Sequence, residues 1–579
     1  MCGFIFYYNK TDINKNDVKK LKLVSSLIKH RGPDYKKIFN QKKIFACHYR
    51  LSIQDTNKRS NQPFFSKDKR YMLLYNGEIY NFKEIKLKIK KKYNFTTSSD
   101  TEVLLASYII YGKKVFKYLK GMFSFLIYDS LKDSIVFSRD HLGQKPLYFY
   151  KDKRSIFFSS EIKPIQKFFN LNLNDNEIKN YLLTNNYGYS RETFFQEINQ
   201  VNAGEYGTLK LSNSKNEEFK FKQFFSKTNL KYSKSKNSNR FNKNLIRITN
   251  QHLISDTSIG ICLSSGLDSR SICAILFYLK KISILKIAYF IHFKNFDLEK
   301  SDVVKFCKYF DIKYKIINII PRDVIKMFNE SIVVNEAPLG GIMNIGLIKL
   351  FKQAKKDNIK VLLGGYGLDE CLGGYDILNP NLKLKNIINL KYTLIDGTKL
   401  SNFRFIRNYN KRKQVGEFLR NTNNLIHKFQ LDMIFKYKIP RTMHMIDRAS
   451  MSSSIEFRNP YVDSRFIEAS LSLDKDKYYD NSLGKMPMRN FLMSNIKFYN
   501  HWFIKKKTIQ SPQTNWLKNK ILVQWIDKII FSKNLYKKNK YLKKKEVQLY
   551  WKKFKKNKIN FGLPIWQIIN IYYLKKNFK

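Results

Sequence analysis

Residues 258–269 read SIGICLSSGLDS, an apolar run that ends in a short segment of serine, glycine and aspartate. The run 258–263 has the length and composition of a buried strand, and a helix pattern follows over 272–279. A strand that turns into a helix through such a segment presents hydroxyl and backbone N–H groups at the helix N-terminus, where the helix dipole attracts anions. We therefore predict that residues 264–269 bind phosphate.

The strand pattern returns further along the chain, with helical stretches between its copies. Apolar runs occur over residues 284–292, 313–320 and 360–363. This alternation is typical of a parallel sheet covered by helices. Beyond about residue 386 the sequence indicates mostly helix. We predict an α/β domain over residues 244–579 with a helical carboxy-terminal part.

The first part of the chain has a different pattern, in which short apolar runs alternate with turn-forming residues. Helix patterns over 18–29 and 100–111 interrupt these runs. Residues 213–243 are rich in serine, asparagine and lysine, which favours a solvated connection. We predict that residues 1–212 form sheets packed by helices. The predicted strands are 4–8, 44–47, 71–75, 123–128, 134–137 and 155–158.

Length and composition exclude several classes of protein. A chain of 579 residues has room for two large domains or more, at about 150 residues each. With 43% hydrophobic and 15% aromatic residues, it has enough apolar material for packed cores, which excludes wholesale disorder. The 6 cysteines are scattered and form no CxxC pair, which favours a reducing compartment. No uncharged apolar segment reaches the roughly 18 residues of a membrane span, so we expect a cytoplasmic protein with no membrane partner.

The basic charge suggests another class of function. Lysine and arginine total 108 against 46 acidic residues, a net charge of +62 that is typical of proteins that bind nucleic acids. The lysines are spread along the whole chain together with many asparagine, isoleucine, tyrosine and phenylalanine residues. Nucleotide bias in a genome produces the same composition. We therefore expect no specific nucleic-acid partner, and a basic nucleic-acid-binding protein is the alternative from a different class.

Cys2 stands directly after the initiator methionine. Removal of Met1 would leave a thiol and a free α-amine on one residue, and an α-amine with a pKa of about 7.7–8.0 accepts a thiol proton near neutral pH. Cys2 is therefore a candidate nucleophile that carries its own base. A small buried strand residue is the other interpretation of a lone cysteine, so the assignment depends on the motifs around it.

These motifs follow Cys2 in a fixed order. They are HRGPD (30–34), HYRLSI (48–53), YNGEIYN (75–81), SDTE (99–102) and RDHLGQKPLY (139–148). Together they resemble the class II glutamine amidotransferase domain of the glutamine-hydrolysing asparagine synthetase family, over nearly all of the first 210 residues. The resemblance implies an N-terminal-nucleophile hydrolase fold, an α+β sandwich with αββα layers, and release of ammonia from glutamine.

The resemblance assigns a catalytic role to three residues. Cys2 would attack the glutamine amide carbon to form a thioester. The side chain of Asn76 and the N–H of Gly77 would hold the developing oxyanion, where one such donor is worth on the order of 10²–10³ in rate.

The resemblance also implies how glutamine is held. Arg50 would bind its carboxylate, and Asp100, with Glu78, would bind its α-ammonium group. The predicted glutamine-binding residues are Arg50, Leu51, Ser52, Ile53, Gln54, Asn76, Gly77, Glu78 and Asp100.

The segment 264–269 closely resembles the PP-loop of ATP pyrophosphatases, which cleave ATP between the α- and β-phosphates. Residues 362–375, LLGGYGLDECLGGY, resemble the second signature of the same synthetases. Because Mg²⁺ prefers carboxylate and phosphate oxygens, Asp268 and Asp369 are candidate ligands of an ion that bridges the phosphates of ATP. The predicted ATP-binding residues are Leu263, Ser264, Ser265, Gly266, Asp268, Ser269, Ile291, Gly364 and Gly365.

Two later segments are similar to the acceptor side of the family. They are residues 447–463, DRASMSSSIEFRNPYVD, and residues 485–489, KMPMR. Lys485 stands where the family has a lysine that stabilises charge as the acyl-adenylate forms and reacts. The resemblance therefore makes Lys485 a further candidate catalytic residue.

Three residues depart from the family pattern. Ser265 replaces a glycine and Arg270 a small residue in the PP-loop. Ser265 fits without strain if its φ is negative. Tyr366 stands where asparagine synthetases carry an acidic residue and β-lactam synthetases carry tyrosine, so it is a candidate catalytic base or an aromatic wall of the acceptor site.

The resemblance implies an enzyme that uses ATP and glutamine to amidate a carboxylate, with release of AMP and pyrophosphate. Aspartate, giving asparagine, is the default acceptor. The alternatives are amidation of another carboxylate, such as a sugar uronate in surface polysaccharide synthesis, and a β-lactam-synthetase-like amide formation. The implied partners are glutamine, ATP with Mg²⁺ and the acceptor, and the family also implies a homodimer and ammonia transfer inside the protein.

Overall fold

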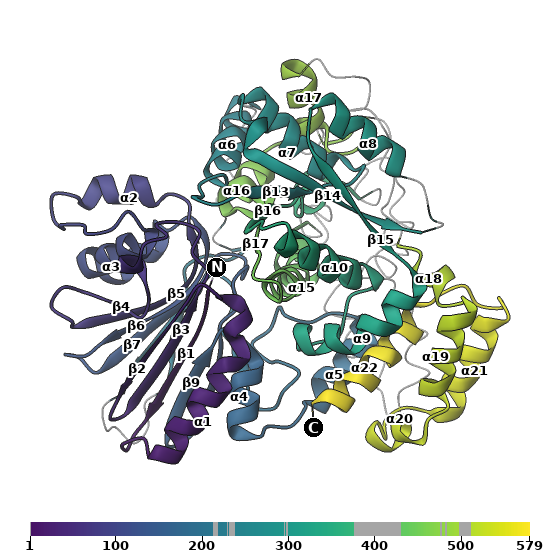
Figure 1. The fold of residues 1–579 in the computed structure, drawn as a ribbon, viewed down its shortest axis with the longest axis horizontal. Helices are drawn as coiled ribbons and strands as arrows, with labels where there is room; N and C mark the ends of the chain where they lie inside the picture. Colours follow the sequence, from purple (N-terminus) through teal and green to yellow (C-terminus); the bar gives the residue numbers. More distant parts are fainter. Residues whose placement is uncertain are drawn as a thin grey trace.

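The computed structural model describes residues 2–211, 218–228, 230, 238–294, 296, 299–375, 430–474, 478–480, 483–496 and 511–578. The chain folds into two lobes that pack side by side (Figure 1). The amino-terminal lobe, residues 2–223, holds two antiparallel sheets, and the carboxy-terminal lobe, residues 238–578, holds a parallel sheet and most of the helices. The start of β1 (Cys2–Asn9) lies at the junction between the lobes (Figure 1).

β1 lies inside the first sheet and is apolar on both faces. It pairs antiparallel with β3 (Ile44–Arg50) and β9 (Ser155–Ser159). Phe4 belongs to the core between the two sheets, whereas Ile5 belongs to the core under the helices. A strand covered on both sides is expected to lack polar alternation. The other strands of this sheet are β2 (Tyr35–Gln41), β8 (Tyr148–Lys151) and β10 (Asn199–Gln200).

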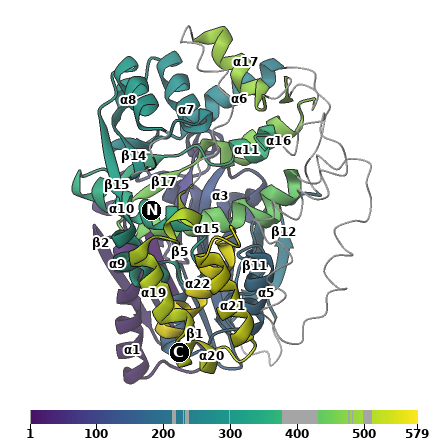
Figure 2. The same ribbon diagram turned by 90° about the vertical axis from the view of Figure 1, so that its right-hand side faces the viewer.

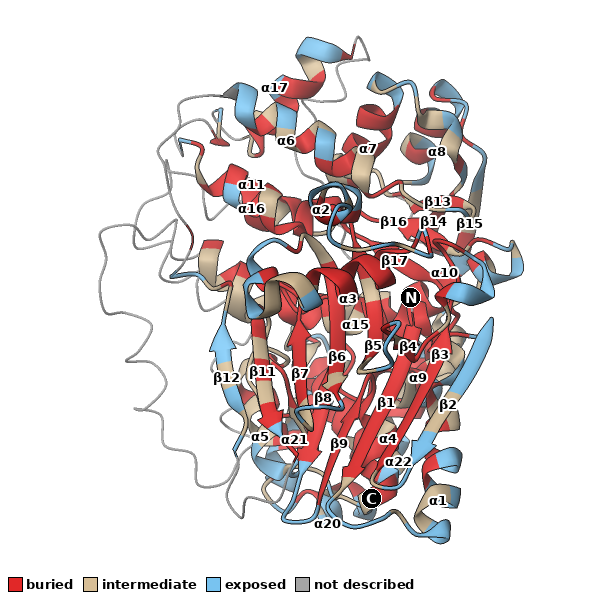
Figure 3. Cartoon of the chain, turned by 90° about the vertical axis from the view of Figure 1, so that its left-hand side faces the viewer, coloured by how far each residue is buried: buried red, intermediate tan, exposed pale blue. Residues whose placement is uncertain are grey.

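The second sheet packs face to face on the first, and helices cover the two outer faces (Figures 1 and 3). This arrangement confirms the predicted αββα sandwich. Its strands, in spatial order, are β12 (Lys220–Gln223), β11 (Glu205–Lys210), β7 (Ser134–Arg139), β6 (Gly121–Asp129), β5 (Tyr71–Ile79) and β4 (Phe64–Phe65). The covering helices are α1 (Lys15–Ser25), α2 (Phe82–Ile89), α3 (Asp100–Tyr111) and α4 (Ile162–Phe169).

One further strand, β12, lies within the predicted connection 213–243. β12 pairs antiparallel with β11 and so continues the second sheet. We propose that the first domain extends to about Gln223 and that the second begins at α6 (Ser238–Gln251).

The sheet of the carboxy-terminal lobe is parallel throughout, in the order β15-β14-β13-β16-β17. This confirms the predicted α/β architecture. The strands are β13 (Ile259–Cys262), β14 (Leu285–Phe293), β15 (Tyr314–Ile319), β16 (Val361–Leu363) and β17 (Glu456–Arg458). The order reverses between β13 and β16, and open α/β sheets bind their ligands at the carboxyl ends of strands at such a reversal.

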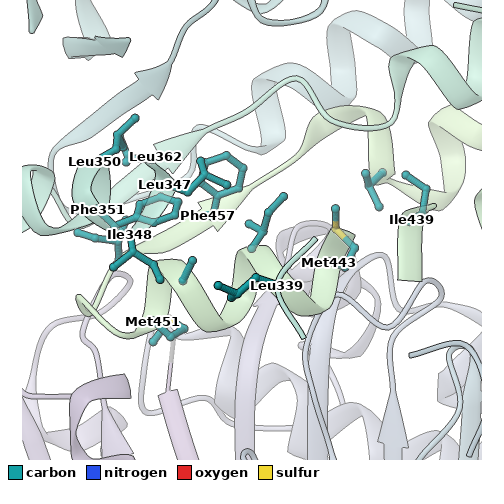
Figure 4. Close-up of a cluster of buried hydrophobic side chains, with 14 of the residues drawn as sticks. Leu339, Leu347, Ile348, Leu350, Phe351, Leu362, Ile439, Met443, Met451 and Phe457 are labelled. Carbon is teal, nitrogen blue, oxygen red and sulfur yellow. The ribbon is translucent and has the colours of Figure 1, made fainter. Parts of the chain in front are cut away.

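Helices on both sides of the parallel sheet bury its apolar faces. Phe351 of α10 packs edge-on against Phe457 of the sheet, with ring centres 5.6 Å apart, and Leu347, Leu362 and Met443 belong to the same buried cluster (Figure 4). The helices of this layer are α7 (Leu267–Tyr278), α8 (Lys300–Tyr309), α9 (Pro321–Asn335), α10 (Ile342–Lys356), α11 (Leu368–Leu372), α15 (Ile439–Met451) and α16 (Ser464–Leu471).

The described carboxy-terminal part is helical, as predicted, while residues 386–429 lie outside the described residues. The last helix returns to the first lobe, where the Gln567 side-chain amide donates to the carbonyl of Tyr181 in α5 (Asp175–Thr184) at 2.9 Å (Figure 2). Within the described ranges, no helix is both long and apolar enough to cross a membrane. The helices of the carboxy-terminal part are α17 (Met486–Asn495), α18 (Gln513–Trp516), α19 (Lys520–Ile530), α20 (Lys533–Lys538), α21 (Lys544–Lys555) and α22 (Leu563–Asn577).

Candidate active site

Cys2 is buried at the start of β1, opposite Arg50 of β3. Its backbone N–H donates to the side-chain oxygen of Asn76 at 3.0 Å. Burial raises the pKa of the thiol, and the Leu51 backbone and the Arg50 charge act in the opposite direction. A buried thiol with a raised pKa needs a nearby base before it can act as a nucleophile.

Asn76 and Gly77 lie on β5 beside this thiol. The Asn76 oxygen is occupied by Cys2, and its Nδ2 is buried with no hydrogen-bond partner among the described residues. Leaving a buried amide without a hydrogen-bond partner costs about 1–3 kcal/mol of stability. A ligand oxygen that accepts from Nδ2 would remove this cost. A Cβ at Gly77 would lie 2.2 Å from the Met122 carbonyl on β6. The close strand contact therefore requires glycine at this position.

Arg50 organises the loop that follows β3. Its Nη1 donates to the Asn57 carbonyl and to the Asn61 side chain, both at 2.8 Å. Within the same loop, Gln54 donates to a carboxylate oxygen of Glu78 at 2.5 Å. The structure thus links the predicted residues Arg50, Gln54 and Glu78, and places the Arg50 guanidinium against the loop. Leu51 and Ile53 are core residues, and the Ser52 N–H donates to the Asp34 carboxylate at 2.7 Å.

Asp100 is held at the first residue of α3. Its Oδ2 accepts hydrogen bonds from the Tyr75 hydroxyl at 2.7 Å and the Ile79 N–H at 3.0 Å. Burial raises the pKa of Asp100, and these two bonds oppose the rise. Asp100 and Glu78 therefore form a buried acidic pair beside β5, which suits a cationic group of a small ligand.

Two charged residues of the second lobe complete this cluster, and the sequence analysis did not place them here. In β17, Arg458 lies 3.5 Å from a Glu78 oxygen and 2.5 Å from a Glu456 oxygen. Burial, and then the charge of Glu456, raise the pKa of Glu78 well above its usual value. Burial alone would raise the pKa of Glu456, but positive charges including Arg458 lower it to about 2. The sequence does hold a signal for this contact, namely two charged residues in one short buried strand. Buried charges require partners, so these residues indicate a neighbouring charged group.

The second candidate site lies at the carboxyl ends of β13 and β16. The Ser264 N–H donates to the Ser269 hydroxyl at 2.9 Å, which closes the loop between β13 and α7. A Cβ at Gly365 would lie 2.7 Å from the Ser269 nitrogen, so the turn after β16 packs directly on the start of α7. The structure thus brings the two predicted signatures together. Ile291 lies near the end of β14, and Leu263, which directly follows β13, donates its N–H to the Tyr289 carbonyl of β14 at 2.8 Å.

Lys485 lies between the two predicted metal ligands. Its Nζ bonds to Asp268 and lies 2.5 Å from an oxygen of Asp369. Burial lowers the pKa of Lys485, but the two carboxylates outweigh it and raise the pKa above its usual value. The carboxylate side chains are 24% and 22% exposed, so solvent reaches them. Two carboxylates beside a phosphate loop are a donor set that Mg²⁺ accepts, and here one ammonium group lies against both of them.

Comparisons with known proteins identify the families to which the two parts of the chain are similar. The glutamine amidotransferase domain family matches residues 1–222, and the asparagine synthase family matches residues 240–576, more than half of the chain. The chain belongs to the asparagine synthase family. Both parts of the family's architecture are therefore present in one polypeptide.

Relatives in this family match at modest identity. Asparagine synthetase [glutamine-hydrolyzing] 1 of Bacillus subtilis (strain 168) is 25% identical, over 92% of this chain and 90% of its own. Asparagine synthetase B [glutamine-hydrolyzing] of Escherichia coli (strain K12) is 32% identical, over 48% of this chain and 44% of its own. The amidase chry2 of Gibberella zeae is 24% identical, over 62% of this chain and 56% of its own.

The structure accounts for some of the departures from the family pattern. Ser265 is not among the residues with positive φ, so it replaces glycine without strain. Arg270 is 3% exposed, and its Nε and Nη2 have no hydrogen-bond partner among the described residues. Its guanidinium lies 5.0 Å from the centre of the Phe306 ring, a cation–π contact.

Tyr366 lies at the end of the turn after β16, with its ring centre 6.0 Å from that of Phe457. Burial raises the pKa of its hydroxyl. A phenol with a raised pKa stays protonated at neutral pH, which favours the wall of the acceptor site over the base. The nearby Cys262 thiol acts in the same direction as burial, so it does not activate the hydroxyl as a base.

Proposed function

We propose that this protein is a glutamine-hydrolysing asparagine synthetase. The observation that carries the proposal is the presence of both candidate sites on one chain, a buried Cys2 bound to Asn76 and a phosphate loop beside Asp268 and Asp369. A site for glutamine hydrolysis alone would not need a phosphate loop, and a site for ATP alone would not need a buried nucleophile.

In the first half of the reaction, removal of Met1 turns the Cys2 nitrogen into an amine. This amine takes the thiol proton, and the thiolate attacks the amide carbon of glutamine. The Asn76 Nδ2, which is buried and unpartnered among the described residues, and the Gly77 N–H would donate to the oxyanion. Collapse of the intermediate releases ammonia and leaves a thioester, which water hydrolyses to glutamate and free Cys2.

Glutamine itself would be held by charges around β5. Arg50 is the candidate partner of its carboxylate, and Asp100 with Glu78 the candidate partners of its ammonium group. Arg50 bonds the loop that carries Gln54, so binding of the carboxylate would also order that loop.

In the second half, loop 264–269 would bind the phosphates of ATP. Asp268 and Asp369 would hold Mg²⁺, which supplies positive charge to the phosphate oxygens when bound. An oxygen of aspartate attacks the α-phosphorus and pyrophosphate leaves, giving the acyl-adenylate. Ammonia then attacks the acyl carbon and AMP leaves, giving asparagine. Lys485, which bonds both carboxylates, would stabilise the negative charge that develops on the reacting phosphate and acyl groups.

Tyr366 is the position at which another acceptor would be accommodated. A neutral hydroxyl offers a hydrogen bond where an acidic residue would offer charge, and one protein similar to this chain is named as an amidase. This observation supports one alternative, amidation of a carboxylate other than that of aspartate.

Pyrophosphate release tests the proposal. The purified protein is incubated with ATP, Mg²⁺ and glutamine, with aspartate, with no acceptor, or with a panel of other carboxylates. We expect release that depends on aspartate, with asparagine formed in equal amount. If pyrophosphate is released only with another acid, that acid and not aspartate is the acceptor. If no acid causes release, the proposal is contradicted.

A further inference from the structure

Arg31 connects the candidate nucleophile to the other lobe. It ends η1 (Ser26–Arg31) and is fully buried. Its Nε donates to the backbone carbonyl of Cys2 at 3.0 Å. Its Nη1 and Nη2 donate to the two carboxylate oxygens of Asp447 at 2.9 and 3.0 Å. One guanidinium therefore bonds the nucleophile residue and a residue of α15 at the same time.

The backbone of Cys2 is thus held at both ends of the residue. Asn76 accepts from its N–H, and Arg31 donates to its C=O. The sulfur lies one rotatable bond from this backbone, so the two bonds set its position to within the choice of a rotamer. A Cβ at Gly3 would lie 2.9 Å from the Arg31 Cδ, so the arginine packs directly against β1.

Asp447 is in turn fixed by the core of the second lobe. α15 carries Ile439, Met443 and Met451, which belong to the buried apolar cluster against the parallel sheet (Figure 4). Asp447 is 4% exposed, and burial would raise its pKa, but Arg31 and Lys145 outweigh this effect and lower it. The carboxylate therefore faces Arg31 as an anion in a rigid frame.

Further buried ion pairs hold the two lobes together around this contact. Arg448 of the second lobe lies 3.7 Å from a Glu161 oxygen, and Lys163 lies 3.3 Å from a Glu336 oxygen. Glu336 of the second lobe accepts from the N–H groups of Ile162 and Lys163 at 2.9 and 2.7 Å, which caps α4 across the junction. Removing one partner of a buried pair leaves an uncompensated charge and is strongly unfavourable. The lobes are therefore docked in a defined geometry.

We propose that Asp447 is a positioning residue of the glutaminase site, acting through Arg31 on the backbone of Cys2, so that the synthetase lobe completes the glutaminase site. The planar fork of arginine is required, because one group must bind a carboxylate with two N–H groups while the Nε serves a third oxygen. The inference rests on the proposed role of Cys2 in glutamine hydrolysis.

The first test is Asp447→Asn, measured for glutaminase activity, for alkylation of Cys2 by a chloroketone analogue of glutamine, and for ammonia-dependent pyrophosphate release. We expect the glutaminase kcat and the alkylation rate to fall about 10- to 100-fold, since small misplacements of a reacting group have effects of this size. The KM for glutamine should change less than about threefold, because Asp447 bonds none of the predicted glutamine ligands. Ammonia-dependent release should stay near the wild-type rate, which also reports correct folding.

The second test separates action through Arg31 from any other effect. Arg31→Lys keeps the charge but loses the fork, so we expect a loss similar to that of Asp447→Asn. The double variant should be no worse than the more damaged single variant, because both changes break one chain of contacts. The control is Arg247→Met, which removes an exposed ion pair with Glu84 across the same junction, at 2.6 Å, and should leave glutaminase activity unchanged.

Three results would overturn the inference: wild-type glutaminase activity in Asp447→Asn, additive losses in the double variant, or a parallel loss of ammonia-dependent release. The third result would mean that Asp447 acts on lobe docking as a whole. If the wild-type protein hydrolyses no glutamine at all, the proposed function fails instead, and the two failures are therefore distinguishable.

Discussion

The proposed glutaminase site buries its charged groups, whereas the proposed phosphate-loop site leaves its carboxylates partly open to solvent. Glu78 and Asp100 are each 4% exposed, while the side chains of Asp268 and Asp369 are 24% and 22% exposed. A closed site suits a small amino acid whose hydrolysis must release ammonia away from water. An open site suits ATP, which brings three phosphates and must let pyrophosphate leave.

The two sites also neutralise their carboxylates differently. In the first, the partner of Glu78 is Arg458 of the other lobe, a group fixed in a strand. In the second, the partner of Asp268 and Asp369 is Lys485, a flexible side chain from the residue that precedes α17. An arginine fixed in a strand holds its carboxylate partner in one position. A lysine has a long side chain with a compact charge, so it can move away from the two carboxylates when a metal ion binds them. We therefore infer that the first site fixes the positions of its charged groups, whereas the second allows a metal ion to replace the ammonium group.

The largest effect should come from Cys2→Ala, which tests whether the sites are chemically separate. Loss of the only proposed nucleophile should lower glutamine-dependent synthesis by at least about 10³-fold. Ammonia-dependent synthesis should be retained within about twofold, because Cys2 bonds nothing in the phosphate loop. Both rates are measured as pyrophosphate release, and loss of both would mean that the sites are not separable.

Asn76→Ala should lower the glutaminase kcat by about 10²–10³-fold, the effect of removing one oxyanion donor. The change also removes the acceptor for the Cys2 N–H. Steady-state hydrolysis of glutamine to glutamate is the measurement, with ammonia-dependent release as the folding control. A rate within threefold of wild type would remove Asn76 from the oxyanion site.

Asp369→Asn should affect only the open site. The loss of one of two candidate metal ligands should reduce pyrophosphate release about 100-fold at limiting Mg²⁺, with partial recovery as Mg²⁺ is raised. Glutamine hydrolysis by the same variant should be unchanged, which serves as the internal control. Undiminished release would exclude Asp369 from the metal site.

The smallest effect concerns stability against acid. The pKa of Glu456 is about 2 in the folded protein against 4.5 ordinarily, so its stabilising contribution is present above pH 4.5 and is lost as the pH falls towards 2. Glu456→Gln should therefore destabilise the protein at pH 7, by on the order of 1–3 kcal/mol, and less as the pH falls. Urea unfolding at pH 7, 5 and 3 measures the difference.

A matched control for this prediction is Glu330→Gln, which removes an exposed pair with Lys352. Exposed pairs contribute about 0–1 kcal/mol, so this variant should differ little from wild type at any of the three pH values. A gap for Glu456→Gln that stays constant from pH 7 to pH 3 would contradict the assignment of its pKa.

The sequence predicted most of the elements that position the two sites. The phosphate loop lies between β13 and α7 as expected, because a buried apolar run followed by a serine-glycine turn has few other solutions. The helix predicted over 18–29 is divided into α1, which ends at Ser25, and the short η1 that ends at Arg31. That break carries Arg31 to the junction, and periodicity alone does not show it.

The contacts between the lobes could not be predicted from the sequence. Segment 447–463 resembles the acceptor side of the family, and that resemblance does not show that Asp447 and Arg458 contact the amino-terminal lobe. Arg31 and Asp447 are 416 residues apart, and in a chain with 108 basic residues no pattern of charge identifies a single partner. Burial selects the pairs, and burial is a property of the folded chain.

The most direct test of the account is whether the two sites work as one enzyme. The protein is given ATP, Mg²⁺, aspartate and glutamine labelled with ¹⁵N in the amide, together with an excess of unlabelled ammonium at a pH where ammonia-dependent synthesis is slow. We predict that asparagine carries the label at close to the enrichment of the glutamine, because ammonia passes inside the protein. Dilution of the label to that of the bulk ammonium would contradict the account.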